Sequence, residues 1–181
     1  MTESPPSTTP QGSSLLHAYL SLFAVAGGII ALDQWTKGWI REHLAFGDSL
    51  TPWPQLPFLR LLHWKNTGAA FGMFQEGGGI FAILAVLVAL MILYYFPRIP
   101  REEWALRLAM SLQLAGALGN LIDRLRLGYV TDFVAVGGFP IFNVADASIS
   151  IGVALLLLSL WLNGDLDSQK EKAASEQLAS D

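Results

Sequence analysis

The stretch GNLIDRLRLGYVTDFVAVGGFPIFNVADASI, residues 119–149, places charged and amide side chains between two long apolar runs. It holds three aspartates, two asparagines and two arginines: Asp123, Asp132, Asp146, Asn120, Asn143, Arg124 and Arg126. Ionisable groups at the edge of hydrocarbon are costly to keep and mark functional sites by default. We therefore expect Asp132 and Asp146 to converge near one membrane surface.

The composition indicates a membrane protein of one domain. The chain has 181 residues, which fits a single domain. Its residues are 52% hydrophobic and 14% charged, whereas about a quarter of the residues of a soluble domain are charged. The absence of cysteine excludes disulfides, thiolate metal sites and cysteine nucleophiles. The net charge of −4 argues against binding of nucleic acid.

Four apolar stretches approach the about 20 residues that a membrane-spanning helix needs. They cover residues 15–32, 77–96, 104–122 and 144–164, and Pro97 closes the second one. Because an open sheet edge is not tolerated in lipid, we predict an all-α integral membrane protein with four transmembrane helices in a domain of residues 15–164. Residues 1–14 lack the basic segment of a cleavable signal peptide and are predicted to be a disordered tail. Residues 165–181 are predicted to be a charged tail.

The connection between the first two apolar stretches is too long for a simple turn. Its beginning, DQWTKGWIREHL (33–44), is predicted to continue the first helix, with Asp33 and Lys37 paired at i, i+4. TPWPQLP (51–57) should break any helix, and FLRLLHW (58–64) is typical of one or two short strands. A turn is predicted to follow at Asn66–Gly68. We expect a small sheet here, lying on the membrane surface.

The orientation of the chain does not follow from its charges. Four spans place both termini on one side of the membrane. The Lys and Arg residues number five on that side and six on the other, so the positive-inside rule does not decide which side is cytoplasmic.

Asp132 and Asp146 have the chemistry of a catalytic pair. They are 14 positions apart, and Gly137, Gly138 and Pro140 between them allow the chain to fold back. Two carboxylates in contact share a proton, because both cannot ionise cheaply. Such a pair can activate water as a base and protonate a carbonyl oxygen as an acid, as in aspartic proteases. We therefore expect the two side chains to act together on a peptide bond.

Structural interpretations of the same residues remain open. Asn143 and Asp146 have the spacing of a capping box at a helix start, and Asp132 resembles a surface residue in a Gly-containing loop. Asp123 and Arg124 are interpreted as an interfacial ion pair. Asn120, in an apolar segment, suits helix association as well as catalysis.

The sequence also bears on metal binding and on functions other than proteolysis. The histidines, His17, His43 and His63, lack acidic neighbours at metal-ligand spacing, so we predict no metal and no cofactor. The six tryptophans are interpreted as interfacial belts. A small transporter or proton-conducting bundle would also use intramembrane acids, but paired repeats are not visible. A purely structural subunit is the third alternative.

Four sequence blocks resemble those of the lipoprotein signal peptidase family, also called signal peptidase II. They are DQWTK (33–37), NTGAAFG (66–72), GNLIDRLRLGYVTDF (119–133) and FNVADASISIG (142–152). The blocks occur in the family's order on a four-span chain of the right length, which makes the resemblance specific.

The resemblance implies an aspartyl endopeptidase of the bacterial cytoplasmic (inner) membrane, with no cofactor. Family members remove the signal peptide from prolipoproteins, cutting before a cysteine that carries diacylglycerol. By motif position, Asp132 and Asp146 correspond to the catalytic pair. Supporting or substrate-binding positions are Asn120, Asp123, Arg124, Asn143, Asn66, Asp33 and Lys37. The implied partners are lipidated prolipoproteins and membrane lipids, not nucleic acid. The implied topology has cytoplasmic termini and an extracytoplasmic active site beneath a small β-cradle.

Overall fold

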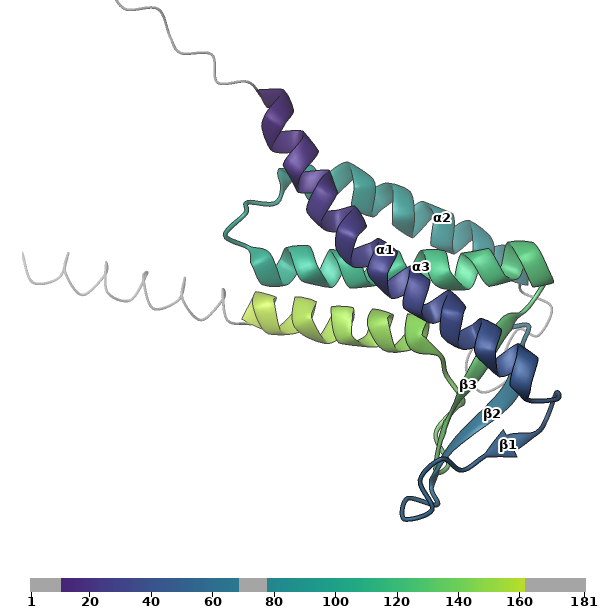
Figure 1. The fold of residues 1–181 in the computed structure, drawn as a ribbon. Helices are drawn as coiled ribbons and strands as arrows, with labels where there is room; N and C mark the ends of the chain where they lie inside the picture. The colour runs from purple at the N-terminus through teal and green to yellow at the C-terminus, as the bar shows by residue number, and fades with distance from the viewer. Residues whose placement is uncertain (1–10, 69–77, 162–181) are drawn as a thin grey trace, which may run out of the picture.

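Helices and one small sheet make up the protein, seen in a computed structural model that describes residues 11–68 and 78–161, without the side chains of residues 11–14, 17 and 18. The helices are α1 (Gln11–His43), α2 (Gly78–Tyr95), α3 (Trp104–Leu127) and an unlabelled helix, Val144–Trp161. The strands β1 (Ser49–Leu50), β2 (Leu59–Asn66) and β3 (Val130–Val136) form an antiparallel sheet in the order β1-β2-β3. The sheet lies at one end of the helices (Figure 1).

Three helices in the described part of the chain are long and apolar enough to cross a membrane, which supports a multi-pass membrane protein. They are Gly78–Arg98, Trp104–Leu127 and Val144–Trp161. The first of the four predicted spans, residues 15–32, forms part of α1, and its crossing of the bilayer stays a prediction. α1 continues without a break to His43, as predicted from its sequence.

The predicted tails lie largely outside the described residues. This applies to residues 1–10 and to all of residues 165–181. α1 begins at Gln11, so its first four residues belong to the predicted first tail and are helical instead of disordered.

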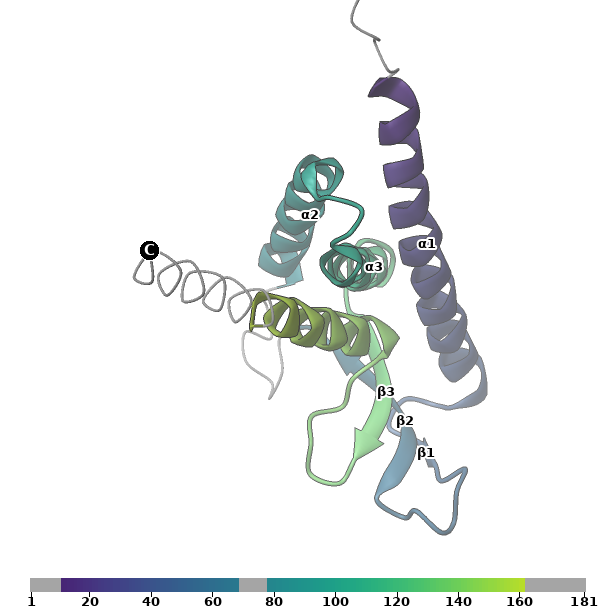
Figure 2. The same ribbon diagram turned by 90° about the vertical axis from the view of Figure 1, so that its left-hand side faces the viewer.

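α3 is the central helix of the bundle. Figures 1 and 2 show it between α1, α2 and the Val144–Trp161 helix, and it packs against both α1 and α2. Its approach to the Val144–Trp161 helix is close, because a Cβ atom added at Gly116 would lie 2.5 Å from the Ala145 carbonyl oxygen. Small residues permit such contact between helix backbones in membranes.

The helix ends follow from local sequence. α2 passes into a 3₁₀ turn at Phe96–Arg98, where Pro97 ends the α-helix as predicted. α3 continues past residue 122 to Leu127 and ends at Gly128, whose φ of 79° is the left-handed conformation that glycine adopts readily. This extension places Asp123 and Arg124 within the helix.

β3 was not predicted, and it corrects the position of Asp132. We expected this residue in a loop, but it lies within the strand and is paired with Trp64 of β2. After β3, Gly137 adopts a φ of 54° and the chain folds back, so that Phe142 pairs with Val134. Most residues of β3 are buried, so the sequence lacks the clear alternation that marks a strand with one solvated face.

Candidate active site

Asp132 is held in β3 by two amide side chains. Its side chain is buried, with 1% of its surface exposed. Oδ1 accepts a hydrogen bond of 2.7 Å from Asn143 Nδ2, and Oδ2 accepts one of 2.9 Å from Asn66 Nδ2. Asn66 is fixed in turn, because its Oδ1 accepts from the Gly68 N–H, which agrees with the turn predicted there.

Asp146 lies in the first turn of the Val144–Trp161 helix and completes a capping box. The Asp146 N–H donates to Asn143 Oδ1 at 2.9 Å, and the Asn143 N–H donates to Asp146 Oδ2 at 3.2 Å. Asp146 Oδ1 accepts a third bond, of 2.8 Å, from Asn120 Nδ2. Asn143 thus contacts both carboxylates, and the structure brings Asp132 and Asp146, the aspartate pair, together around this one residue.

Burial changes the protonation of Asp132. Burial, reinforced by the nearby charge of Asp146, raises the pKa of Asp132 to about 7. The hydrogen bonds from Asn66 and Asn143 and the charge of Lys37 act in the opposite direction. A carboxyl group that titrates near neutral pH can both accept and donate a proton under physiological conditions.

Lys37 is the centre of a buried ionic network beside the aspartate pair. Its Nζ lies 2.8 Å from Asp33 Oδ2 and 3.3 Å from Asp123 Oδ2, and it is fully buried. The predicted pair of Asp33 and Lys37 is therefore confirmed. Asp33 also ties α1 to the start of the Val144–Trp161 helix, because its Oδ1 accepts from the Ala145 N–H at 2.9 Å.

The network fixes the orientation of the Asn120 amide. Asn120 Oδ1 accepts from Lys37 Nζ at 2.9 Å and from Asn143 Nδ2 at 3.1 Å. Because these donors occupy the oxygen, Asn120 Nδ2 faces Asp146 and donates to it. Lys37 therefore fixes the Asn120 amide, which in turn donates a hydrogen bond to Asp146.

Three residues of this network were missed by the sequence analysis. Gln34 Nε2 lies within hydrogen-bond distance of Asp33 Oδ2, Asp123 Oδ1 and the Gly119 carbonyl. Arg41 Nη1 donates to Thr131 Oγ1 at 2.9 Å, and the Thr131 N–H donates to Asp123 Oδ2. Gln34 and Thr131 are next to Asp33 and Asp132 in the sequence. This adjacency is the signal that could have identified them as members of the network.

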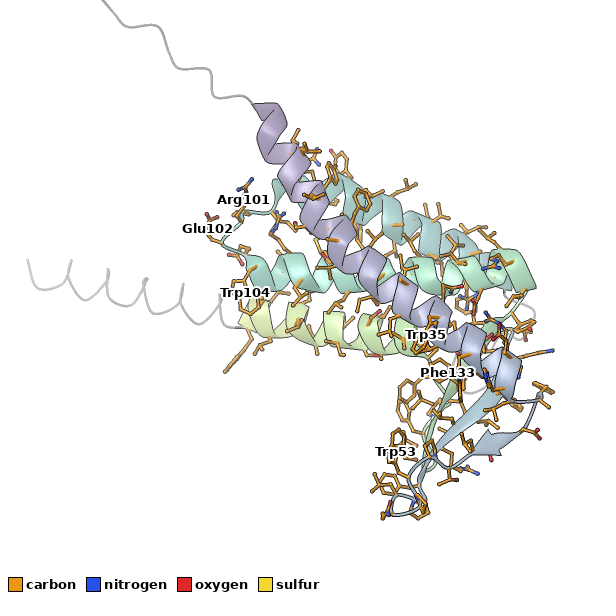
Figure 3. All side chains as sticks on the ribbon, in the orientation of Figure 1. Trp35, Trp53, Arg101, Glu102, Trp104 and Phe133 are labelled. Atoms are coloured by element: carbon orange, nitrogen blue, oxygen red, sulfur yellow. The ribbon has the colours of Figure 1, made fainter. Side chains whose placement is uncertain are left out.

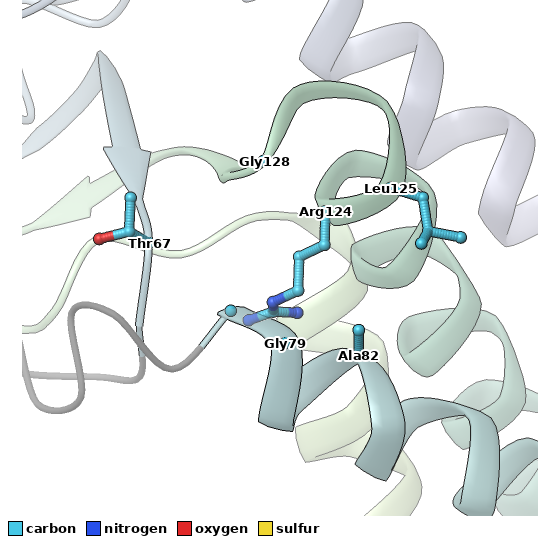
Figure 4. Close-up of a pocket in the computed structure, with 7 residues that line it drawn as sticks. Thr67, Gly79, Ala82, Arg124, Leu125 and Gly128 are labelled. Carbon is cyan, nitrogen blue, oxygen red and sulfur yellow. The ribbon is translucent and has the colours of Figure 1, made fainter.

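The expected ion pair between Asp123 and Arg124 is not among those formed by the described residues. Asp123 faces Lys37 and, at 3.9 Å, Arg41. Neighbours in a helix point in different directions and do not face each other. Arg124 instead lies 5.3 Å from the centre of the Phe81 ring, and its Nη2 donates to the Gly68 carbonyl at 3.4 Å. Arg124 lines a cavity of about 400 Å³ together with Thr67 and Gly79, and Figure 4 shows its guanidinium close to Gly79.

A second, mostly apolar cavity opens beside Asp146. Its volume is about 590 Å³, within the usual range of ligand pockets. It is lined by Asn66, Phe139, Pro140, Ile141, Phe142, Asp146, Ala147, Ile149, Ser150 and Ile151. One carboxylate of the aspartate pair thus borders a space suited to apolar groups.

The described histidines have structural contacts. His43 Nδ1 lies 2.8 Å from the Trp39 carbonyl oxygen, and His63 Nδ1 lies 2.8 Å from that of Leu44. Within residues 11–68 and 78–161, no group of three His, Asp or Glu side chains is arranged to hold a metal ion. The side chain of His17 lies outside the description.

Comparisons with known proteins agree on one family. Residues 25–162 match the family model described as Signal peptidase (SPase) II. The lipoprotein signal peptidase of Acinetobacter baumannii is 42% identical over 151 residues, which cover 79% of this chain and 82% of the relative. That of Streptococcus pyogenes serotype M1 is 40% identical over 140 residues, covering 76% and 90%.

Solved structures resemble the fold as well. One bacterial membrane enzyme, studied by the in meso method, superposes with a TM-score of 0.72 at 34% identity and covers 85% of this chain and 90% of its own. A second gives a TM-score of 0.68 at 35% identity, covering 83% and 93%. The family match spans most of the chain, and it includes every residue that contacts the aspartate pair. The chain therefore belongs to the signal peptidase II family.

Proposed function

We propose that this chain is an aspartyl endopeptidase that removes the signal peptide from prolipoproteins, cutting before a diacylglyceryl-modified cysteine. The relatives described above are lipoprotein signal peptidases. The observation that carries the catalytic assignment is the contact of Asn143 with both Asp132 and Asp146. Family membership argues against the transporter and the structural subunit.

In the proposed reaction the aspartate pair holds one proton and one water molecule. The ionised carboxylate takes a proton from the water, whose oxygen attacks the scissile carbonyl carbon, while the protonated carboxyl donates its proton to the carbonyl oxygen. The tetrahedral intermediate then collapses. The carbon–nitrogen bond breaks while the newly protonated carboxyl passes its proton to the leaving amine. One hydroxyl of the intermediate returns its proton to the other, now ionised carboxylate, so that the pair again holds one proton.

The surroundings of the pair support a lipidated substrate. The 590 Å³ cavity beside Asp146 offers an apolar lining to acyl chains. Asn66 also lines this cavity, and we propose that it and Arg124 contact the substrate backbone.

The proposal includes a location and a topology. We place the enzyme in the bacterial inner membrane, where α1 crosses the bilayer in addition to the three other helices. Both termini then lie in the cytoplasm, and the sheet lies outside as a small β-cradle. Asp132 lies in the sheet at one end of the helices (Figure 1), so this topology puts the aspartate pair at the extracytoplasmic face.

The proposal predicts that Asp132→Asn and Asp146→Asn each abolish cleavage. General acid–base groups contribute about 10²–10⁴-fold to rate, so we expect a loss of at least about 100-fold in a gel-shift assay with a lipidated prolipoprotein. Asp48→Asn is the matched control, because Asp48 is exposed beside β1 and outside the site. Near-normal cleavage by either pair variant, with unchanged folding, would contradict the assignment.

A further inference from the structure

The end of the bundle remote from the aspartate pair has a small pocket with both polar and apolar walls. Its volume is about 220 Å³, and it is lined by Ser21, Val25, Phe96, Arg101, Trp104, Arg107, Leu108 and Ser111. Figure 3 shows Arg101 and Trp104 at this end, opposite the sheet and Trp53. The candidate span Trp104–Leu127 begins here, so the pocket lies where hydrocarbon gives way to headgroups.

Arg107 is held in place within this pocket. Its Nη1 donates to the Ile99 carbonyl at 3.0 Å, and its Nη2 lies 3.3 Å from Ser21 Oγ. The guanidinium also lies 4.3 Å from the centre of the Phe96 ring. A guanidinium has five N–H donors in a fixed plane, so these contacts orient the group without using its whole capacity.

Arg101 adds a second positive charge to the rim. It is exposed, and it lies close enough to Arg107 for the two charges to repel each other. Among the described residues that line the pocket, none is acidic, although Glu102 and Glu103 belong to the same loop. An anion between the two guanidinium groups would relieve the repulsion.

We propose that this pocket binds the phosphate headgroup of an anionic phospholipid, from the leaflet opposite the aspartate pair. Basic pockets between transmembrane helices recognise anionic headgroups, and arginine matches the geometry of phosphate oxygens. The glycerol and the upper acyl carbons lie against Val25 and Leu108, and Trp104 occupies the interface. The inference does not depend on the proposed peptidase activity.

The bound lipid joins separate parts of the chain. Ser21 and Val25 belong to α1, Phe96 to the turn after α2, and Arg107 to α3. Because the lipid binds only the assembled arrangement, the unfolding temperature should rise as the lipid concentration is raised above the dissociation constant.

The test uses the full chain in a zwitterionic detergent. It is titrated separately with dihexanoyl phosphatidylglycerol, dihexanoyl phosphatidylcholine and inorganic phosphate, while native mass spectrometry counts bound molecules and thermal unfolding measures stability. We expect saturable binding and a raised unfolding temperature with phosphatidylglycerol only. Arg101→Gln should weaken this binding about tenfold, the effect of a lost charge-assisted hydrogen bond.

Arg98→Gln is the matched control. It removes the same charge at the same end of the bundle, but Arg98 packs on the Tyr94 ring and does not line the pocket. Equal weakening by Arg98→Gln would overturn the proposal in favour of general surface attraction. Equal binding of phosphatidylcholine or of inorganic phosphate would also overturn it. Arg101 is exposed, so its variant should unfold at the parent temperature without lipid.

Discussion

Asn143 serves a helix end and the aspartate pair with the same side chain. Its Oδ1 accepts the N–H of Asp146, as a capping residue should, while its Nδ2 donates to Asp132. The capping interpretation and the catalytic interpretation of this motif are therefore compatible. A spacing in the sequence could not choose between them, because both require the same residues at the same positions.

The buried carboxyl of Asp132 makes stability depend on pH. An aspartate in an unfolded chain has a pKa of about 3.9, and folding raises the pKa of Asp132 to about 7. The folded state therefore holds the proton more tightly, and the protein should lose stability as pH rises from about 4 to about 7.

Asp132→Asn should remove that loss. We expect the free energy of unfolding of the variant, relative to the parent, to rise between about pH 4 and pH 7 by of order 1–4 kcal/mol. Denaturant titrations in micelles at several pH values measure this difference. The substitution also changes the hydrogen bonds to Asn66 and Asn143, but this contribution to the free energy of unfolding does not vary with pH. A flat difference would contradict the raised pKa.

Lys37→Met should be strongly destabilising. The change leaves the buried carboxylate of Asp33 without its cation and that of Asp123 with only Arg41, at 3.9 Å. Breaking a buried ion pair costs about 3–5 kcal/mol. Unfolding titrations measure the loss, and adding Asp33→Asn should restore part of it. Lys65→Met is the control. Lys65 is exposed and packs on aromatic rings, so its removal should cost no more than about 1 kcal/mol. Similar costs for both lysines would contradict the network.

At the level of elements, the helices that a local sequence pattern marks were predicted correctly. The long apolar runs and Pro97 predicted α2 and the start of α3 closely. β3 was missed because its pairing partner, β2, lies more than 60 residues earlier and both of its faces are largely covered. The predicted ion pair of Asp123 with Arg124 was also wrong, because the contacts of Asp123 depend on how α1 crosses α3.

The contact between α3 and the Val144–Trp161 helix should be sensitive to a single methyl group. At Gly116 a Cβ would lie 2.4 Å from Ile149 Cγ1 and 2.5 Å from the Ala145 carbonyl oxygen. Gly116→Ala should therefore separate the helices and destabilise the protein by about 1–3 kcal/mol. Because Asp146 adjoins Ala145, cleavage should fall as well, by up to about 100-fold for a displacement near 1 Å.

Gly28→Ala provides the comparison for this change. Gly28 lies in α1, and a Cβ added there meets nothing within 4 Å. Thermal unfolding and the gel-shift assay should find this variant close to the parent. If Gly116→Ala behaves in the same way, the two helices are not packed as closely as described.

On the scale of the whole molecule, the proposed orientation can be tested with single thiols. The chain has no cysteine, so Asp48→Cys and Glu102→Cys each introduce one reactive group, at exposed positions near opposite ends of the helices. A membrane-impermeant maleimide should label Asp48→Cys on intact spheroplasts, and Glu102→Cys only after permeabilisation. The reverse pattern would place the aspartate pair on the cytoplasmic side.

The two carboxylates of the aspartate pair come from different elements, one from β3 and one from the helix that follows it. Asn66 of β2 donates to Asp132, and Lys37 of α1 fixes the Asn120 amide that donates to Asp146. No segment alone contains a complete centre. If the proposed mechanism holds, a chain whose last helix has not yet met the earlier ones lacks the assembled pair, and we expect it not to cleave.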